Sequence, residues 1–120
     1  ATIEPWHGNQ LVVYRPASDG SSNFSREVIF SELSGGHALA VADLNNNGFD
    51  EIIVGGRNRP YSLLIFRYNA ETREWQRRSV DNDVAVSGLA IADLTGDGFK
   101  DIAVVGSATA DVVIYRSSGL

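Results

Sequence analysis

An internal repeat of about 50 residues is the feature that most limits the folds open to this 120-residue chain. Residues 38–56 and 88–106 are identical at 10 of 19 aligned positions, at an offset of 50. A second segment occurs three times, at residues 11–15, 63–67 and 112–116, with offsets of 52 and 49 between its copies. Repetition at this period is typical of folds in which one small unit recurs and packs on its neighbours.

Each repeat predicts four short β-strands and no helix. The segments are apolar or alternating, rich in Val, Ile and aromatic residues, and separated by Gly, Asn, Asp and Ser. The complete copy predicts strands over residues 38–44, 51–56, 62–68 and 74–80. Its first strand is small and apolar, whereas its fourth carries Arg77 and Arg78. A gradient from a crowded inner strand to a charged outer strand is typical of a β-propeller blade.

We therefore predict an all-β chain of about two four-stranded antiparallel blades plus extra strands. Partial copies predict further strands over 11–15 and 26–33 before the complete blade, and over 89–94, 101–105 and 112–116 after it. The predicted organisation is the end of one blade (1–35), a full blade (36–86) and three strands of a further blade (87–120). A non-propeller stack of small sheets is the alternative.

Closed propellers have about four to eight blades, so we expect this partial propeller to close only within a longer chain or by oligomerisation. The predicted partners are the remaining blades of a longer propeller or copies of the chain itself. An unpaired edge strand favours pairing between copies. A self-assembling propeller ring is accordingly one hypothesis for its function.

The composition excludes several classes of site and partner. Ten Lys and Arg against 15 Asp and Glu give a net charge of −5, which argues against nucleic acid as a partner. Without cysteine, a metal must use oxygen ligands or the two histidines. The apolar runs are too short to span a bilayer and no signal peptide is recognisable, so we expect no membrane partner.

Two polar loops with the same spacing predict calcium binding, with Mg²⁺ as an alternative ion in the same loops. Residues 43–51 and 93–101 place oxygen-bearing side chains at loop positions 1, 3, 5 and 9, with a backbone carbonyl at position 7, and Ca²⁺ takes six to eight such oxygens. The predicted ligands of the first loop are Asp43, Asn45, Asn47, Phe49 and Glu51, and those of the second are Asp93, Thr95, Asp97, Phe99 and Asp101. Three carboxylates against two predict tighter binding in the second loop.

The sequence excludes one kind of calcium site in these loops and leaves one alternative to calcium binding. An EF-hand is excluded because Val54 and Val104 stand where it needs a bidentate Glu. The alternative is that Asp, Asn and Gly only make hydrogen-bonded turns.

The motif around these loops resembles the FG-GAP or VCBS repeats of integrin-type and bacterial secreted propellers. It consists of Ala-x-Ala-Asp-Leu, the polar loop, Gly-Phe, and an Ile/Val strand ending in Gly. The resemblance implies a secreted protein, with an extracellular or periplasmic location. Residues 3–9, 36–39 and 105–109 resemble more narrowly the last propeller blades of aldos-2-ulose dehydratase-like proteins, which implies a metal-assisted sugar lyase.

Propeller topology also predicts a ligand site at the end opposite the polar loops. His7, Arg57 and Arg59 lie in links between second and third strands, and His37 precedes an inner strand, so we expect all four near the axis with Trp6. Aromatic stacking, guanidinium contacts and an imidazole are what a carbohydrate or sugar-acid site uses. Additional hydroxyls are expected from Ser87, Ser107 and Thr109.

These residues support two further hypotheses of function. The first is a calcium-binding scaffold or carbohydrate-binding module. The second is part of a sugar lyase or dehydratase, with His7 or His37 as base or metal ligand and Arg57 stabilising a developing enediolate. The alternative for Trp6 is packing between blades, and His7 has the alternative role of a hydrogen bond within its turn.

Overall fold

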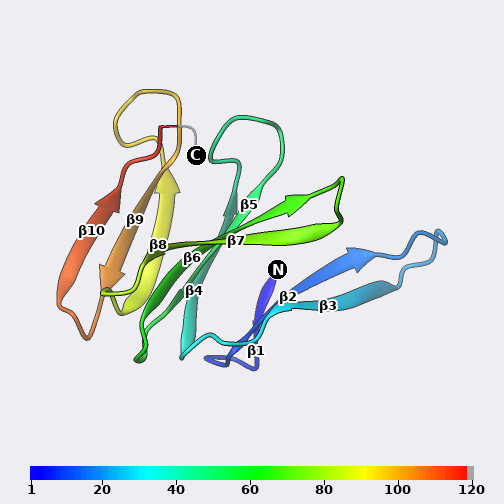
Figure 1. Cartoon of the computed structure of the whole chain (residues 1–120), viewed down its shortest axis with the longest axis horizontal. Helices are drawn as coiled ribbons and strands as arrows, with labels where there is room; N and C mark the ends of the chain where they lie inside the picture. The colour runs from blue at the N-terminus through cyan, green and yellow to red at the C-terminus, as the bar shows by residue number, and fades with distance from the viewer. Residues whose placement is uncertain (119–120) are drawn as a thin grey trace.

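The computed structural model describes residues 1–118, which form ten β-strands (Figure 1). The strands are β1 (Thr2–Glu4), β2 (Gln10–Pro16), β3 (Phe24–Phe30), β4 (Gly36–Ala42), β5 (Glu51–Gly56), β6 (Ser62–Asn69), β7 (Glu74–Asp81), β8 (Val86–Ala92), β9 (Asp101–Gly106) and β10 (Asp111–Tyr115). The described residues contain no helix, and hence none that could cross a membrane.

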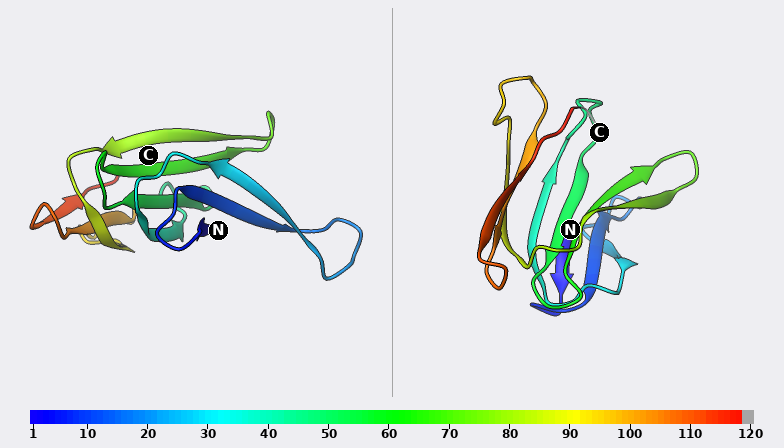
Figure 2. Two further views of the ribbon diagram at one scale, coloured as in Figure 1. Left: turned by 90° about the horizontal axis from the view of Figure 1, so that it is seen from below. Right: turned by 60° about the vertical axis from the view of Figure 1, so that its left-hand side comes forward.

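The strands form three antiparallel sheets, in the orders β1-β2-β3, β4-β5-β6-β7 and β10-β9-β8. The first and third sheets lie at opposite ends of the molecule with the second between them (Figure 1, Figure 2). The predicted all-β fold of antiparallel blades that do not close is therefore confirmed. The division of the chain into blades at 1–35, 36–86 and 87–120 stays a prediction.

The strand bounds differ from the prediction at β1, at β3 and at the inner strands, and β3 is Phe24–Phe30 where residues 26–33 were predicted. β1 was not predicted, because three residues before a proline are too few to show an alternating pattern. The inner strands β4 and β8 begin and end earlier than predicted, because Asp43 and Asp93 leave the strand and accept hydrogen bonds from the loop. His37 therefore lies within β4, at the bulge between Gly36 and Ala38, and not before the strand.

The second sheet is covered on both faces. Side chains of a strand alternate between its two sides, and each side contributes to a different core cluster. Ile53, Leu63 and Ile65 belong to a core cluster shared with the third sheet. Val54 and Phe66 belong to a second cluster shared with the first sheet. Two apolar interfaces thus hold three sheets together.

Gly55 permits a close approach at the interface between the second and third sheets. A Cβ built at Gly55 would lie 2.3 Å from Cγ1 of Val86, the first residue of β8. This glycine therefore lets β8 pack directly on β5.

A polar network covers the outward face of the first sheet. The Tyr14 hydroxyl donates to Glu4 Oε1 at 2.6 Å, and Arg26 Nη2 donates to Glu4 Oε2 at 2.6 Å. Hydrogen bonds from Tyr14, Arg26 and Thr2 lower the pKa of Glu4 to about 2.

This lowered pKa predicts a loss of stability in acid. Because the folded pKa of Glu4 lies below the unfolded value, the network stabilises the protein above about pH 4.5 and loses this effect as the pH falls toward 2. Urea unfolding at several pH values should show a smaller acid loss in Glu4→Gln than in the parent. Equal slopes in the two proteins would contradict the assignment.

Candidate functional site

Three chain segments meet at one end of the first and second sheets. The Gly36 amide donates to the Gly8 carbonyl at 2.9 Å, which joins the β3–β4 link to the β1–β2 turn. The Arg57 amide donates to the Gly35 carbonyl at 3.0 Å, which joins the β5–β6 link to the same place. These backbone hydrogen bonds fix the positions of the side chains that the segments carry.

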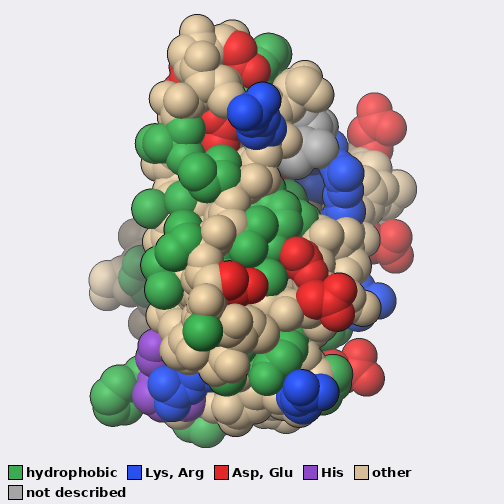
Figure 3. Space-filling model, turned by 90° about the vertical axis from the view of Figure 1, so that its left-hand side faces the viewer, with side chains coloured by type: hydrophobic (Ala, Val, Ile, Leu, Met, Phe, Trp, Pro, Cys, Tyr) green, Lys and Arg blue, Asp and Glu red, His purple; other side chains and the backbone are tan. Residues whose placement is uncertain are grey.

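The structure brings Trp6, His7, His37 and Arg57 together here, and we call these four residues the histidine rim. The ring centroids of Trp6 and His7 are 4.5 Å apart, and those of His7 and His37 are 4.6 Å apart. Arg57 Nη2 lies 3.5 Å from His7 Nδ1. In the space-filling view, purple histidine atoms and a blue Lys or Arg side chain lie together at one end of the molecule (Figure 3). The roles of these side chains stay predictions.

Trp6 does not pack between sheets within the described residues. Its side chain is 86% exposed, and its packing between blades stays an alternative prediction. Trp75, in contrast, packs on the core cluster of the first and second sheets, with its ring centroid 5.2 Å from that of Tyr68.

The electrostatics of the rim favour a neutral imidazole at His37. Burial lowers the pKa of His37, and the neighbouring charges of Arg57 and His7 lower it further. His7 Nε2 and His37 Nδ1 are buried and have no hydrogen-bond partner in the protein. Buried polar atoms normally have partners, so these two nitrogens are unsatisfied hydrogen-bonding groups within residues 1–118.

The other predicted ligand residues lie in separate groups. Arg59 stacks on Tyr61, with its Cζ 5.3 Å from the ring centroid, and lines a shallow pocket with Thr109, Asn82 and Asp83. The hydroxyls of Ser87 and Ser107 are hydrogen-bonded to each other. Within residues 1–118, Arg59 contacts Ser34 and Tyr61, and Thr109 contacts Ala85, so these groups have their interactions away from the histidine rim.

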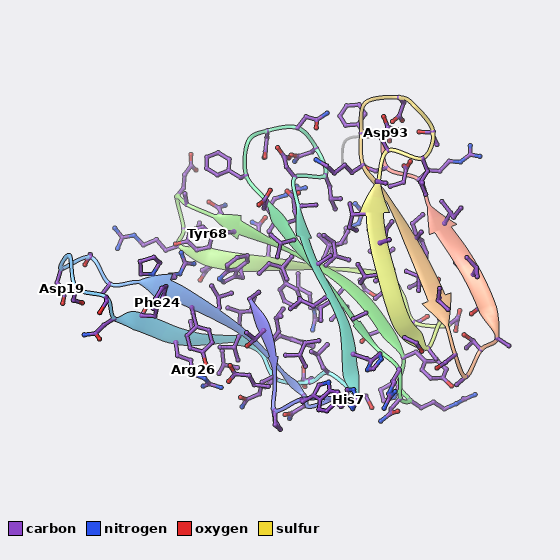
Figure 4. The ribbon with its side chains drawn as sticks, turned by 180° about the vertical axis from the view of Figure 1, so that it is seen from behind. His7, Asp19, Phe24, Arg26, Tyr68 and Asp93 are labelled. Carbon is purple, nitrogen blue, oxygen red and sulfur yellow. The ribbon has the colours of Figure 1, made fainter. Side chains whose placement is uncertain are left out.

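The two polar loops lie at the opposite end of the molecule, as the labels of His7 and Asp93 show in Figure 4. They contact each other across the second and third sheets. Asn46 Nδ2 donates to the Gly98 carbonyl at 2.9 Å, and Lys100 Nζ lies 3.4 Å from the Asp43 carbonyl.

In the first loop the acidic side chains already have partners. Asp43 accepts the amides of Asn47 at 3.2 Å and Gly48 at 2.7 Å. Glu51 is 1% exposed and accepts the Leu44 amide and Arg67 Nε, both at 2.9 Å. The charge of Glu51 is therefore compensated by a guanidinium.

In the second loop the acidic side chains accept hydrogen bonds from the backbone. Asp93 accepts the amides of Gly96 at 2.7 Å and Gly98 at 2.8 Å. Asp101 is 0% exposed and accepts amides of three residues, Ser117 at 2.8 Å, Leu94 at 2.9 Å and Thr95 at 3.2 Å. The hydrogen bond from Ser117, followed by those from Leu94 and Thr95, holds the pKa of Asp101 below its usual value.

The acidic side chains of the two loops differ in how their charges are compensated, and calcium binding in either loop stays a prediction. Within residues 1–118, no three His, Asp or Glu side chains converge on one point as a metal site. Both loops instead have the hydrogen-bonded turns that the sequence offered as the alternative. However, neutral amides leave the negative charge of Asp93 and Asp101 in place, whereas Arg67 compensates that of Glu51.

Sequence reasoning missed one pocket, of about 520 Å³, between the first polar loop and the β6–β7 hairpin. Phe49 and Tyr68 line it, together with the Glu51–Arg67 ion pair. Phe49 was predicted only as a carbonyl ligand, yet its ring is 74% exposed. The pocket brings together two segments that no local pattern connects, so the sequence gives no signal for it.

Comparison with known proteins places the chain in a family. A model of the FG-GAP-like repeat matches residues 5–54 and 44–104. Integrin alpha-7 of Homo sapiens is 33% identical and that of Mus musculus 32% identical, each over 132 aligned residues. Each alignment covers 95% of this chain but 11% of the integrin.

No solved structure gives a significant match. The integrin relatives do not bear on the narrower resemblance to aldos-2-ulose dehydratase-like proteins, which stays a prediction. The match of the repeat model to most of the residues, in a structure of three antiparallel sheets, shows that the chain belongs to the FG-GAP-like repeat family of β-propeller segments.

Proposed function

We propose that this chain is a carbohydrate-binding propeller segment whose histidine rim takes a sugar acid. The observation that carries the proposal is the 86% exposed Trp6 ring beside two imidazoles that each have an unpartnered buried nitrogen. An exposed indole offers a flat apolar surface to a sugar ring. The guanidinium of Arg57 suits the carboxylate of a sugar acid.

Titration with glucuronate is expected to change the tryptophan fluorescence, and to do so at lower concentration than titration with glucose. Trp6→Ala should weaken glucuronate binding about tenfold or more, because the stacking surface is lost. Arg57→Lys should reduce the preference for glucuronate over glucose, because a lysine cannot make the bidentate contact.

The matched control is Trp75→Phe, which removes the other tryptophan and should leave glucuronate binding intact. Calorimetry gives the affinities independently of fluorescence. Equal affinity of the parent and Trp6→Ala for glucuronate would exclude the rim as the binding site.

A lyase role for the same rim is the second candidate, and the lowered pKa of His37 favours it. An imidazole that is neutral at pH 7 is able to accept a proton from a carbon next to a carbonyl. In an aldos-2-ulose dehydratase-like protein, as the sequence resemblance implies, the substrate would be an anhydroketose. Turnover of 1,5-anhydrofructose by the chain, lost in His37→Ala, would support this role, whereas sugar binding without turnover would support the binding module.

We also propose that the second polar loop binds calcium and thereby stabilises the contact between the second and third sheets. The uncompensated carboxylates of Asp93 and Asp101 support this proposal, as does the contact of Asn46 with Gly98 across the loops. Loops of this kind in extracellular modules bind calcium with a Kd on the order of 10⁻⁴ M. Such an affinity suits an extracellular or periplasmic location, which we infer for this chain.

A further inference from the structure

One asparagine of the chain lies in the acceptor sequence of N-linked glycosylation. Of the eight asparagines, only Asn23 is followed at the second position by Ser or Thr, in the segment Asn23-Phe24-Ser25. The sequence Asn-x-Ser, in which x is not proline, is recognised when an oligosaccharide is attached in the secretory pathway, and it marks a surface loop. Such a site must be accessible on the folded protein.

The acceptor segment is exposed at the tip of the β2–β3 hairpin. Asn23 is the residue before β3, and it and the next two residues are exposed, Phe24 by 63%. The hairpin extends from the body of the molecule, and its tip at Asp19 lies away from His7 and Asp93 (Figure 1, Figure 4). A glycan on Asn23 would hence have space, and it would leave the histidine rim and the polar loops open.

The side chain of Asn23 is not used to hold its loop. Within residues 1–118, the hydrogen bonds of Asn23 are made by its backbone, whose amide donates to Ser21 Oγ at 3.3 Å and whose carbonyl accepts the Ala17 amide at 2.9 Å. The loop therefore keeps its shape whether or not the side-chain amide is modified.

Other asparagines of the chain have a structural role that Asn23 lacks. Asn9 Nδ2 donates to the Ser31 carbonyl at 3.0 Å, and Asn69 Oδ1 accepts the Glu71 amide at 2.9 Å. A sugar on such a side chain would disturb the turn that the hydrogen bond stabilises. The asparagine in the acceptor sequence is thus one that can carry a sugar without this cost.

The position of Asn23 also gives a glycan a physical role. In the order β1-β2-β3, β3 lies at an edge of the first sheet among the described residues, and its first five residues are exposed. An edge strand presents unpaired N–H and C=O groups to which another chain can add, and native proteins block such edges. A bulky, hydrated oligosaccharide at the residue before β3 would hinder this pairing.

We propose that Asn23 is the acceptor of an N-linked glycan that shields the edge of β3. In the attachment, Nδ2 of Asn23 forms a bond to C1 of the first sugar of a lipid-pyrophosphate-linked oligosaccharide. The bond from C1 to the pyrophosphate oxygen breaks, the lipid pyrophosphate leaves, and Nδ2 loses one proton. The proposal rests on the extracellular location inferred above and is independent of what the histidine rim binds.

Expression of the full chain in cultured mammalian cells, with a signal peptide fused to its N-terminus, tests the acceptor site. Mass spectrometry compares the protein before and after treatment with peptide-N-glycosidase F, which removes N-linked glycans. The parent should carry one glycan, located on Asn23. Asn23→Gln and Ser25→Ala should carry none, whereas the matched variant Ser25→Thr should keep the glycan, because Thr also completes the acceptor sequence.

A secreted parent without a glycan would overturn the acceptor site, as would a glycan that persists in Ser25→Ala. Retention of the parent in the cells would instead count against the extracellular location. Glucuronate titration of the same protein tests the histidine rim separately.

Light scattering of concentrated protein tests the shielding of the β3 edge. The glycosylated parent should aggregate more slowly than Asn23→Gln, because the edge of β3 is open in the variant. Circular dichroism confirms that the two proteins have the same fold. Equal rates of aggregation would overturn the shielding role.

Discussion

Replacing Leu63 by alanine is expected to lower the free energy of unfolding by about 2–5 kcal/mol, the usual cost of removing a fully buried leucine side chain. Leu63 is 0% exposed and lies in the cluster between the second and third sheets. The loss should be large because the sheets pack on both sides of this residue and leave little freedom to close a cavity. Urea unfolding of the dilute protein measures it.

The repeat supplies the matched control for this prediction. Val112 occupies the same position in the recurring segment but is 70% exposed. Val112→Ala should therefore change the stability by less than about 0.5 kcal/mol. If both substitutions cost the same, either the third sheet does not cover Leu63 or Val112 is itself covered in the dilute protein.

Calcium is expected to raise the stability of the chain by about 2.7 kcal/mol at a free concentration one hundred times the Kd, which is about 10 mM for a Kd on the order of 10⁻⁴ M. For a domain of about 100 residues, each kcal/mol corresponds to roughly 4–8 °C in Tm. Thermal unfolding with calcium and with a chelator measures the difference. Chelation should return the Tm to its calcium-free value.

Asp97→Asn should remove most of the calcium effect, because it takes one of the three carboxylates from the second loop while keeping the oxygen that accepts the Phe99 amide. Asp50→Asn is the control, since it is the same substitution at an aspartate of the first loop that occupies none of the predicted ligand positions. The same Tm for the parent in calcium and in chelator would refute the calcium site. A loss of the effect in Asp50→Asn as well would mean that general charge screening, and not ligation, is responsible.

The fold was predictable because the repeat is expressed in local patterns. Residues 51–56 read as a strand in the sequence and form β5 with the same bounds. The gathering of His7, His37 and Arg57 also followed from topology, since links of the same type in neighbouring sheets lie at the same end. Side-chain pairing did not follow, because Glu51 and Arg67 belong to different strands and nothing near either residue marks the ion pair.

The sequence also could not predict which of the nearby arginines belongs to the histidine rim. Arg59 is only two residues from Arg57, and composition gives no reason to separate them. In the structure Arg59 turns to Tyr61 and the pocket near Thr109, because its neighbours in space come from the link after β9 and the segment after β7. Such neighbours are set by sheet packing, which the linear order does not specify.

Each end of the molecule connects a different pair of neighbouring sheets. The histidine rim is assembled from loops of the first and second sheets, while Asn46 and Gly98 connect loops of the second and third. A sugar acid bound at the rim would consequently stabilise the interface of the first and second sheets. An ion bound at the polar loops would stabilise the interface of the second and third sheets. Occupancy at both ends would then fix the angles between the three sheets.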